Sequence, residues 1–204
     1  MALELPTEPY LDQVERWPRE GRHILAHFDP ESIVVYQAYR PSIGRYVLEH
    51  RAFGGPEFSF SRMSWIKPNF LWMMYRSGWG TKEGQEQILG VRIRRAFFDR
   101  ILGQAVASGY SAEEYATRDA WQAALASSDV RLQWDPDHDP EGNPVARRAV
   151  QLGLRGDVLR AYATTEILDV LDMTPLVVSQ RAHSARDRWP LLRTPEERVY
   201  PGLA

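Results

Sequence analysis

The residues with the clearest potential for chemistry lie between Ser59 and Glu86. Aromatic, cationic and hydroxyl side chains are mixed there: Ser61, Arg62, Ser64, Trp65, Lys67, Trp72, Tyr75, Arg76, Ser77, Trp79 and Lys82. Aromatic faces can stack on a nucleobase or a nicotinamide ring, while nearby cations bind phosphate. This mixture predicts an anion site built from Arg62, Lys67 and Arg76.

A purely structural role is the alternative for the same stretch. Trp65, Phe70 and Leu71 could belong to the core, with the aliphatic stems of arginines covering them. Each aromatic residue taken singly fits that interpretation. Three cations beside one apolar helix favour the anion site, because packing alone does not require them.

Glu86 is the candidate catalytic residue. It follows a glycine-rich turn, residues 78–84, and precedes a predicted strand, a position that would set its carboxylate at the mouth of a cleft. A carboxylate there could bind a ribose hydroxyl or stabilise positive charge that develops on a sugar ring. The alternative is a solvent-exposed glutamate at the start of an edge strand.

Composition limits the class of protein and its partners. The chain has 204 residues, of which 44% are hydrophobic and 25% charged, as in an ordinary globular domain. Only Lys67 and Lys82 among the 25 basic residues are lysines, so the other 23 are arginines. Codon bias explains such a ratio, and so does two-point binding of phosphate. A net charge of -2 argues against sequence-independent binding of duplexes.

Several classes of site are excluded or disfavoured. With no cysteine, the chain has no disulfide, thiolate zinc site or cysteine nucleophile, and we expect a cytoplasmic protein. No apolar run approaches the roughly 20 residues of a membrane span, so we expect no membrane partner. The serine-hydrolase elbow, P-loop and dinucleotide fingerprints are missing from the sequence.

A metal is not expected. Asp135, Asp137, Asp139 and Glu141 alternate along one segment, but the glycine and glutamate that an EF-hand loop needs are replaced by Pro140 and Ala146. Magnesium bound through one or two of these carboxylates stays an alternative to a solvated acidic turn. The five histidines are dispersed and lack the pattern of a zinc hydrolase.

Periodicity and breakers predict a single α+β domain, with a small central sheet and flanking helices, over residues 22–204. Residues 1–21 form a partly irregular N-terminal arm in this interpretation. The predicted strands are 32–39, 58–66, 87–93, 130–134 and 147–154. The predicted helices are 43–51, 68–76, 94–107, 111–125, 157–172 and 175–185. The segment 135–144 is predicted as a loop, and the C-terminal tail as irregular.

One resemblance covers nearly the whole chain beyond the arm. It rests on Val35–Tyr39, on the long tryptophan-rich motif of residues 58–80, on Gln85-Glu86 and on Gln133–Pro136. These segments resemble a domain-of-unknown-function family, number 4291, of bacteria and fungi. Membership in that family implies no established activity.

A weaker likeness is to the ADP-ribosyltransferase fold, in which a first-strand polar residue, a Ser-x-Ser strand and a later glutamate surround NAD. Tyr36 or Gln37, then Ser59-Phe60-Ser61, then Glu86 follow this order. Two departures weaken the likeness. The usual histidine or arginine is absent from residues 36–38, and Gly84 replaces the polar residue two places before the glutamate.

The leading hypothesis is therefore a nucleotide-binding enzyme that resembles ADP-ribosyltransferases, with NAD as cofactor and Glu86 as catalytic residue. The cofactor-binding residues of this hypothesis are Tyr36, Gln37, Ser61, Arg62, Trp65, Lys67 and Arg76. The second hypothesis is a non-catalytic module that binds RNA, single-stranded DNA or a nucleotide through the same side chains. The third is an interaction protein without a ligand. The sequence leaves the oligomeric state open.

Overall fold

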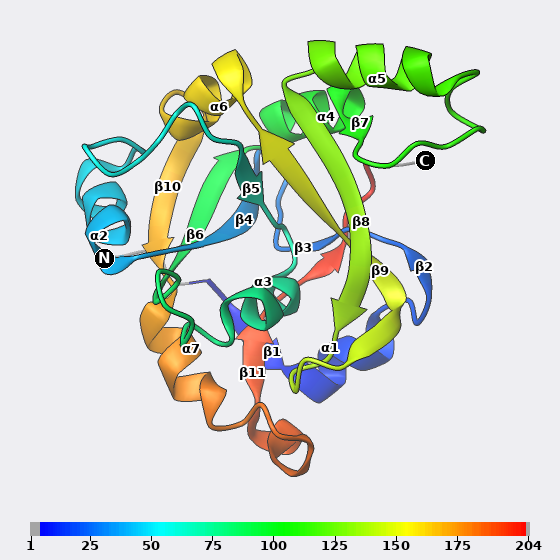
Figure 1. Cartoon of the computed structure of the whole chain (residues 1–204). Helices are drawn as coiled ribbons and strands as arrows, with labels where there is room; N and C mark the ends of the chain where they lie inside the picture. The colour runs from blue at the N-terminus through cyan, green and yellow to red at the C-terminus, as the bar shows by residue number, and fades with distance from the viewer. Residues whose placement is uncertain (1–4, 203–204) are drawn as a thin grey trace.

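The computed structural model describes residues 5–202 and confirms the α+β class (Figure 1). The helices are α1 (Tyr10–Arg16), α2 (Pro41–His50), α3 (Phe70–Ser77), α4 (Arg95–Gln104), α5 (Arg118–Ser127), α6 (Gly156–Ala163), α7 (Thr174–Arg181) and the 3-10 helix η1 (Arg186–Leu191). The strands are β1 (Thr7–Pro9), β2 (Gly21–Arg22), β3 (Leu25–Ala26), β4 (Ser32–Tyr39), β5 (Ser64–Ile66), β6 (Gln87–Arg94), β7 (Val106–Ala107), β8 (Val130–His138), β9 (Pro144–Leu154), β10 (Ile167–Asp172), β11 (Arg193–Pro195) and β12 (Arg198–Val199). Over residues 5–202, every helix falls short of the length and apolar character that a membrane crossing needs.

Two sheets meet at a seam in the middle of the molecule. One is antiparallel with the order β10-β6-β4, and the other has the order β2-β9-β8-β7, with β5 also paired to β9. At the seam, the Tyr36 amide donates to the Lys67 carbonyl at 2.7 Å, and the Lys67 amide donates to the Tyr36 carbonyl at 3.3 Å. These two bonds join β4 to the residue that follows β5. The backbone of Lys67 is therefore held by both sheets, and Figure 1 shows β5 beside β4.

Strand β4 is buried on both faces. Ile33 and Val35 lie in a core cluster with Phe97 of α4, whereas Val34 and Tyr36 lie in a second cluster with Phe70 of α3. Successive side chains of a strand point to opposite faces, so one β-branched run supplies two cores. This explains why the run from Ser32 reads as continuously apolar rather than alternating.

Helix α3 begins at an anchored N-terminus. The Asn69 side chain accepts a hydrogen bond from the Trp72 amide at 2.6 Å, which is a standard N-cap. The Phe70 amide donates to the carboxylate of the buried Glu197 at 2.7 Å. Gly78, with a φ of 58°, ends the helix in the left-handed conformation. Both ends of α3 are thus determined by specific residues.

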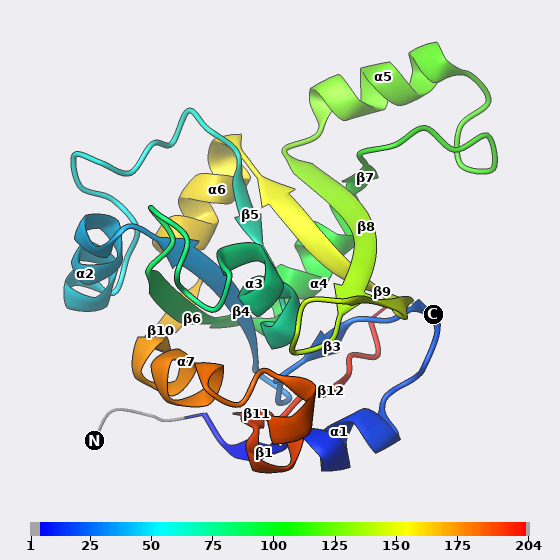
Figure 2. The ribbon, with the colours of Figure 1, turned by 60° about the horizontal axis from the view of Figure 1, so that its bottom comes forward.

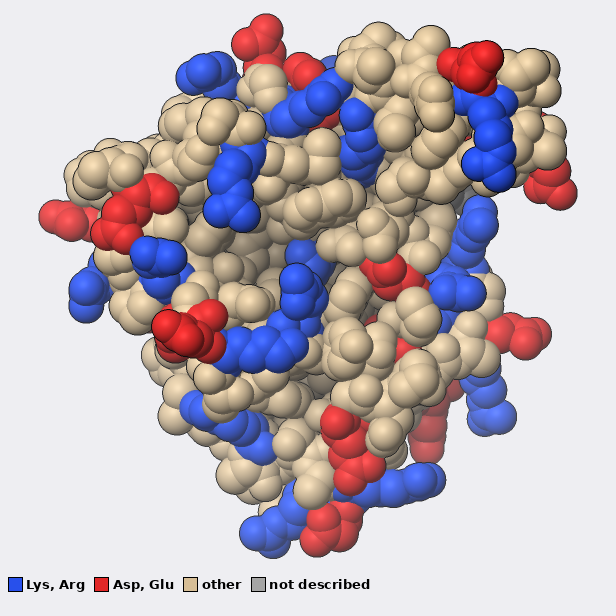
Figure 3. Space-filling view, in the orientation of Figure 1, with Lys and Arg blue, Asp and Glu red and all other residues tan. Residues whose placement is uncertain are grey.

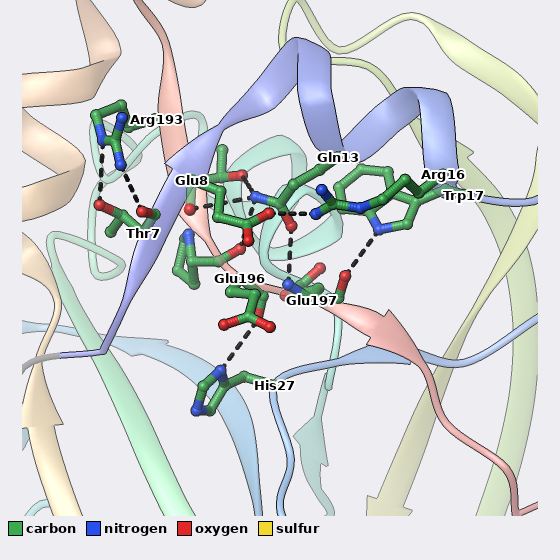
Figure 4. A network of polar contacts seen from close by, with 11 residues as sticks. Thr7, Glu8, Gln13, Arg16, Trp17, His27, Arg193, Glu196 and Glu197 are labelled. Carbon is green, nitrogen blue, oxygen red and sulfur yellow. Dashed lines mark hydrogen bonds and ion pairs between the residues drawn. The ribbon is translucent and has the colours of Figure 1, made fainter.

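The N-terminal and C-terminal segments bind each other. Strand β1 pairs with β11. Beside this pair, Gln13, Trp17, Thr194 and Glu197 form a buried network of hydrogen bonds (Figure 4). Gln13 donates to the Thr194 hydroxyl at 2.9 Å and accepts from the Glu197 amide at 2.8 Å. The Trp17 indole donates to the Glu197 carbonyl at 2.9 Å. The described part of the predicted irregular arm and tail is therefore ordered.

The helix predicted over residues 157–172 is wrong in its second half. Helix α6 ends at Ala163, and residues 167–172 form β10, which pairs antiparallel with β6. Pairing with β6 satisfies the backbone of this segment and buries Val170 and Leu171, which outweighs its helical periodicity.

Further boundaries differ from the sequence predictions, among them the end of the helix predicted over 94–107, the last two residues of which form β7. Of the strand predicted over 58–66, only β5 forms, and residues 58–63 are a loop. Helix α5 begins after Thr117, whose hydroxyl accepts from the Ala120 amide, instead of at Ser111. Strand β8 continues to residue 138, because its pairing with β9 extends past Pro136 into the predicted loop.

Helix α5 buries no residue and projects from the body in both ribbon views (Figure 2).

Replacing Glu197 tests the anchor of α3. We expect Glu197→Ala to lower the free energy of unfolding by about 1–3 kcal/mol, because the buried Phe70 amide loses its acceptor. Glu197→Gln keeps an acceptor oxygen and is the matched control, so most of the stability should remain. Urea denaturation at pH 7 measures both variants, and equal losses would contradict the role of the hydrogen bond.

The difference in stability between the wild type and Glu197→Gln should also depend on pH. Burial raises the pKa of the Glu197 carboxyl well above its usual value of 4.5. The folded state therefore holds this proton more tightly than the unfolded state does. The stability of the wild type relative to Glu197→Gln should fall as the pH rises above 4.5, and a difference that is independent of pH would overturn this expectation.

Candidate functional site

A pocket of about 610 Å³ opens at the seam between the two sheets. Figure 3 shows this face hollowed near its centre, with basic side chains around the hollow. The lining residues come from β4, the N-terminal end of α2, the loop before β5, β5 and its C-terminal flank, α3, the turn before β6, β8 and β9. They are Gln37, Ala38, Tyr39, Arg40, Ile43, Glu57, Phe58, Ser59, Arg62, Met63, Ser64, Trp65, Lys67, Met73, Arg76, Gly84, Gln85, Gln133 and Gln151.

Lys67 lines the pocket and is only 5% exposed. Its Nζ atom makes one long hydrogen bond, 3.4 Å, to the Trp65 carbonyl, and among residues 5–202 no carboxylate lies within 4.0 Å of it. Burial, together with the nearby positive charge of Arg76, lowers the pKa of Lys67 to about 8, and Asp135 acts weakly in the opposite direction. This amine therefore loses its proton far more readily than an ordinary lysine.

Arg62 and Arg76 are exposed at the pocket and have unused guanidinium groups. Within the described chain, neither guanidinium makes a hydrogen bond or an ion pair. By contrast, Arg40, which also lines the pocket, lies 3.4 Å from the carboxylate of Glu57. Arg62 and Arg76 can thus bind an anion without first breaking a contact within the protein.

Gln37 lines the pocket but its amide group is occupied. The side-chain nitrogen donates to the Ser64 hydroxyl at 2.8 Å and to the Trp65 carbonyl at 3.1 Å, and the side-chain oxygen accepts from the Tyr162 hydroxyl at 2.7 Å. These bonds tie β4 to β5 and α6. Gln37 therefore holds the floor of the pocket in place.

The ring of Trp65 forms part of the pocket wall and lies against Gly153 of β9. A Cβ atom at Gly153 would come within 3.0 Å of the Trp65 ring and 2.5 Å of the Met63 sulfur. Only glycine leaves room for the ring in this position. The close approach fixes the position of the ring of a residue that lines the pocket.

The other three predicted site residues lie outside the lining. Tyr36 is fully buried in the second core cluster, and its hydroxyl has no hydrogen-bond partner within residues 5–202. Ser61 is exposed on the loop, where its hydroxyl lies 2.9 Å from that of Ser59. One oxygen of Glu86 accepts from the Gly84 amide at 2.9 Å, and the other is buried without a partner in the described chain.

The structure thus brings together Gln37, Arg62, Trp65, Lys67 and Arg76, and it leaves Tyr36, Ser61 and Glu86 beside this group. Each of the three is next in sequence to a lining residue: Tyr36 to Gln37, Ser61 to Arg62 and Glu86 to Gln85.

The sequence interpretation missed a cluster on β8 and β9. Gln133 and Gln151 are directly opposite each other, and both donate to the Asp135 carboxylate, at 2.8 Å and 2.7 Å. The signal was the two-residue spacing of Gln133 and Asp135, which places both side chains on one face of a strand. The prediction of a loop from residue 135 concealed it.

The remaining carboxylates of the acidic run have separate partners. Asp137 forms a buried ion pair with Arg147 at 2.6 Å, and Asp139 accepts from the Asn143 amide at 2.9 Å. Within residues 5–202, no three metal-ligating side chains are grouped as a metal site would need.

The sequence profile of the domain of unknown function DUF4291 matches residues 23–200, which is most of the chain, and the chain belongs to this family. No curated protein matches it significantly.

Replacing Lys67 should change how stability depends on pH. Because the Lys67 pKa is about 8 in the folded state and near 10.4 in the unfolded state, the unfolded state binds more protons between these values. We expect Lys67→Met to be more stable than the wild type by about 3 kcal/mol below pH 8, the energy equivalent of the pKa shift. This advantage should shrink as the pH rises from 8 to 10.5.

Denaturant unfolding of both proteins at pH 7, 9 and 10 measures that difference. Lys82→Met is the matched control, because Lys82 is exposed on the neighbouring turn. A stability difference between Lys67→Met and the wild type that stays constant over this range would contradict the buried-amine interpretation.

Proposed function

We propose that the pocket binds a phosphate-bearing nucleotide of the NAD or ADP-ribose class. The observation that carries the proposal is a pair of guanidinium groups, Arg62 and Arg76, that have no partner among the described residues and line the same pocket as the buried amine of Lys67 and as Trp65. Guanidinium groups bind phosphate oxygens in pairs of parallel hydrogen bonds. The indole face is suited to stacking on a base or a nicotinamide.

The size and polar lining of the pocket support the same class of ligand. Its volume of about 610 Å³ lies within the 300–1,000 Å³ range typical of small-molecule sites. Gln85, Gln133 and Gln151 supply amide groups of the kind that bind ribose hydroxyls and base edges. We further propose a cytoplasmic location, which a chain without cysteine favours.

A transferase activity at this pocket is the finer part of the proposal. Glu86 would stabilise the positive charge that develops on a ribose as its bond to the base breaks. Its place directly after the lining residues Gly84 and Gln85, and its unpartnered carboxylate oxygen, support this role. Glu86→Gln should retain nucleotide binding and lose any turnover of NAD, which product analysis by chromatography would measure.

Ligand-induced stabilisation tests the binding proposal. A nucleotide at 100 times its dissociation constant should stabilise the fold by about 2.7 kcal/mol, so thermal unfolding with NAD, ADP-ribose or ATP gives a clear shift. We expect Arg62→Ala and Arg76→Ala each to weaken binding by about 10- to 100-fold, because each removes a charge-assisted contact worth about 1.5–3 kcal/mol.

Arg188→Ala is the matched control for these two variants. Arg188 is exposed on η1, and within residues 5–202 its guanidinium makes no hydrogen bond or ion pair, so its removal should leave affinity unchanged. An equal loss in all three variants would mean that nucleotides bind through general charge. No shift with any of the three nucleotides would refute the proposal.

Single-stranded nucleic acid is the second candidate ligand, and one observation favours it. Tyr75, the residue before Arg76, is 41% exposed and stacks on His138 at a ring distance of 3.5 Å. Such a ring beside the pocket could stack on a second base. If short RNA or DNA binds and the affinity falls steeply between 50 and 200 mM salt, this candidate replaces the small nucleotide.

A further inference from the structure

Lys67 is placed unlike the other lysine of the chain. Lys67 is buried at the pocket, next to the charge of Arg76 and without a carboxylate partner among the described residues. Lys82 is exposed and its Nζ atom donates to the Arg76 carbonyl at 2.8 Å. In a chain with 23 arginines, the most deeply buried cation of this pocket is one of only two primary amines on side chains.

A buried amine beside a second cation is suited to nucleophilic chemistry. Burial and the neighbouring guanidinium both disfavour the ammonium form, so a large part of Lys67 is neutral near pH 8. A neutral amine has the lone pair that attacks a carbonyl carbon, whereas an ammonium ion does not. For phosphate alone a third guanidinium would serve better, because it stays charged when buried.

We propose that Lys67 captures the open-chain aldehyde of a phosphorylated sugar, such as the terminal ribose of ADP-ribose, as an imine. Arg62 and Arg76 bind the phosphate, so the inference rests on the proposed function. NAD has the same phosphates but no free aldehyde, because the anomeric carbon of each ribose is held in a glycosidic bond. The two ligands therefore separate binding from capture.

The step is balanced without an oxidant or a metal. The neutral amine of Lys67 attacks the aldehyde carbon, a carbon–nitrogen bond forms, and one amine proton moves to the carbonyl oxygen. The resulting carbinolamine then loses its hydroxyl group together with the second amine proton as water, and the carbon–nitrogen double bond of an imine forms between Lys67 and the sugar. Asp135, the carboxylate whose charge acts on Lys67, is held by Gln133 and Gln151 at a position from which it can favour the protonated imine.

Reductive trapping tests the capture directly. The full chain is incubated at pH 8 with ADP-ribose and sodium cyanoborohydride, which supplies hydride to the imine and fixes it as a secondary amine. The mass of the labelled peptide should increase by that of ADP-ribose less one oxygen atom. We expect Lys67 to be labelled at least about tenfold faster than Lys82, because about half of Lys67 is neutral at this pH, against about 0.4% for an ordinary lysine.

Variants and other ligands then separate imine formation at Lys67 from binding of the phosphate. Lys67→Met should lose the label at position 67 and keep the slow label at Lys82, which shows that the variant and the reagent are sound. Ribose, which lacks phosphate, should label Lys67 at least tenfold more slowly than ADP-ribose, and NAD should slow labelling by ADP-ribose. Arg62→Ala and Arg76→Ala should each slow labelling, whereas Arg188→Ala should not.

Each result has one meaning. Equal labelling of Lys67 and Lys82 by ADP-ribose overturns the capture, even where thermal shifts show that nucleotides bind. Rapid labelling of Lys67 that ribose matches and NAD leaves unchanged supports a reactive amine and overturns its link to phosphate binding. Rapid, phosphate-dependent labelling of Lys67 that NAD suppresses supports both proposals.

Discussion

Two backbone hydrogen bonds between Tyr36 and Lys67 hold the molecule together at its centre. They join a three-stranded sheet to a second sheet that reaches the opposite side of the fold. The neighbouring Gln37 reinforces the joint, because its amide contacts β5 and α6 at once. The backbone of Lys67 is thus fixed at the seam, where its side chain is only 5% exposed. The unusual environment of this amine is therefore a consequence of how the sheets are joined.

The pocket has a buried floor, which includes Gln37 and Lys67, and a solvent-exposed rim, which includes Arg62 and Arg76. Ionisable groups are rarely buried, because burial without a partner costs several kcal/mol, and perturbed groups gather at functional sites. Lys67 is such a group, whereas the buried Arg147 is paired with Asp137 and serves the fold. Arg62 and Arg76 keep their charges in water, where they can meet a ligand before it reaches the floor. Recognition of an anion and chemistry on a neighbouring atom are thus divided between the rim and the floor.

Local patterns predicted the parts of the site that lie in one stretch of chain. The strands β4 and β6 follow from β-branched runs between breakers, and Arg62, Trp65, Lys67 and Arg76 come from a single motif around β5 and α3. Contacts distant in sequence were not predictable. Both faces of the strand that contains Tyr36 are buried, so the alternation of apolar and polar residues could not show which face of β4 lines the pocket. Residues 167–172 form strand β10 by pairing with β6, which is distant in sequence. The cluster around Asp135 likewise depends on the pairing of β8 with β9. Glu86 turns back onto the Gly84 amide, a local bond that no spacing pattern reveals.

The anchoring of α3 by Glu197 bears on how the protein is made. Glu197 lies 127 residues after Phe70 in the chain, and its carboxylate accepts a hydrogen bond from the Phe70 amide. During synthesis on a ribosome, the first turn of α3 therefore emerges long before its acceptor, and chain growth at about 5–20 residues per second sets the delay. Strands β8 and β9, which complete the pocket, also emerge in that interval. The Phe70 amide consequently lacks its native acceptor until Glu197 has left the exit tunnel, so the anchored form of α3 is completed only near the end of synthesis.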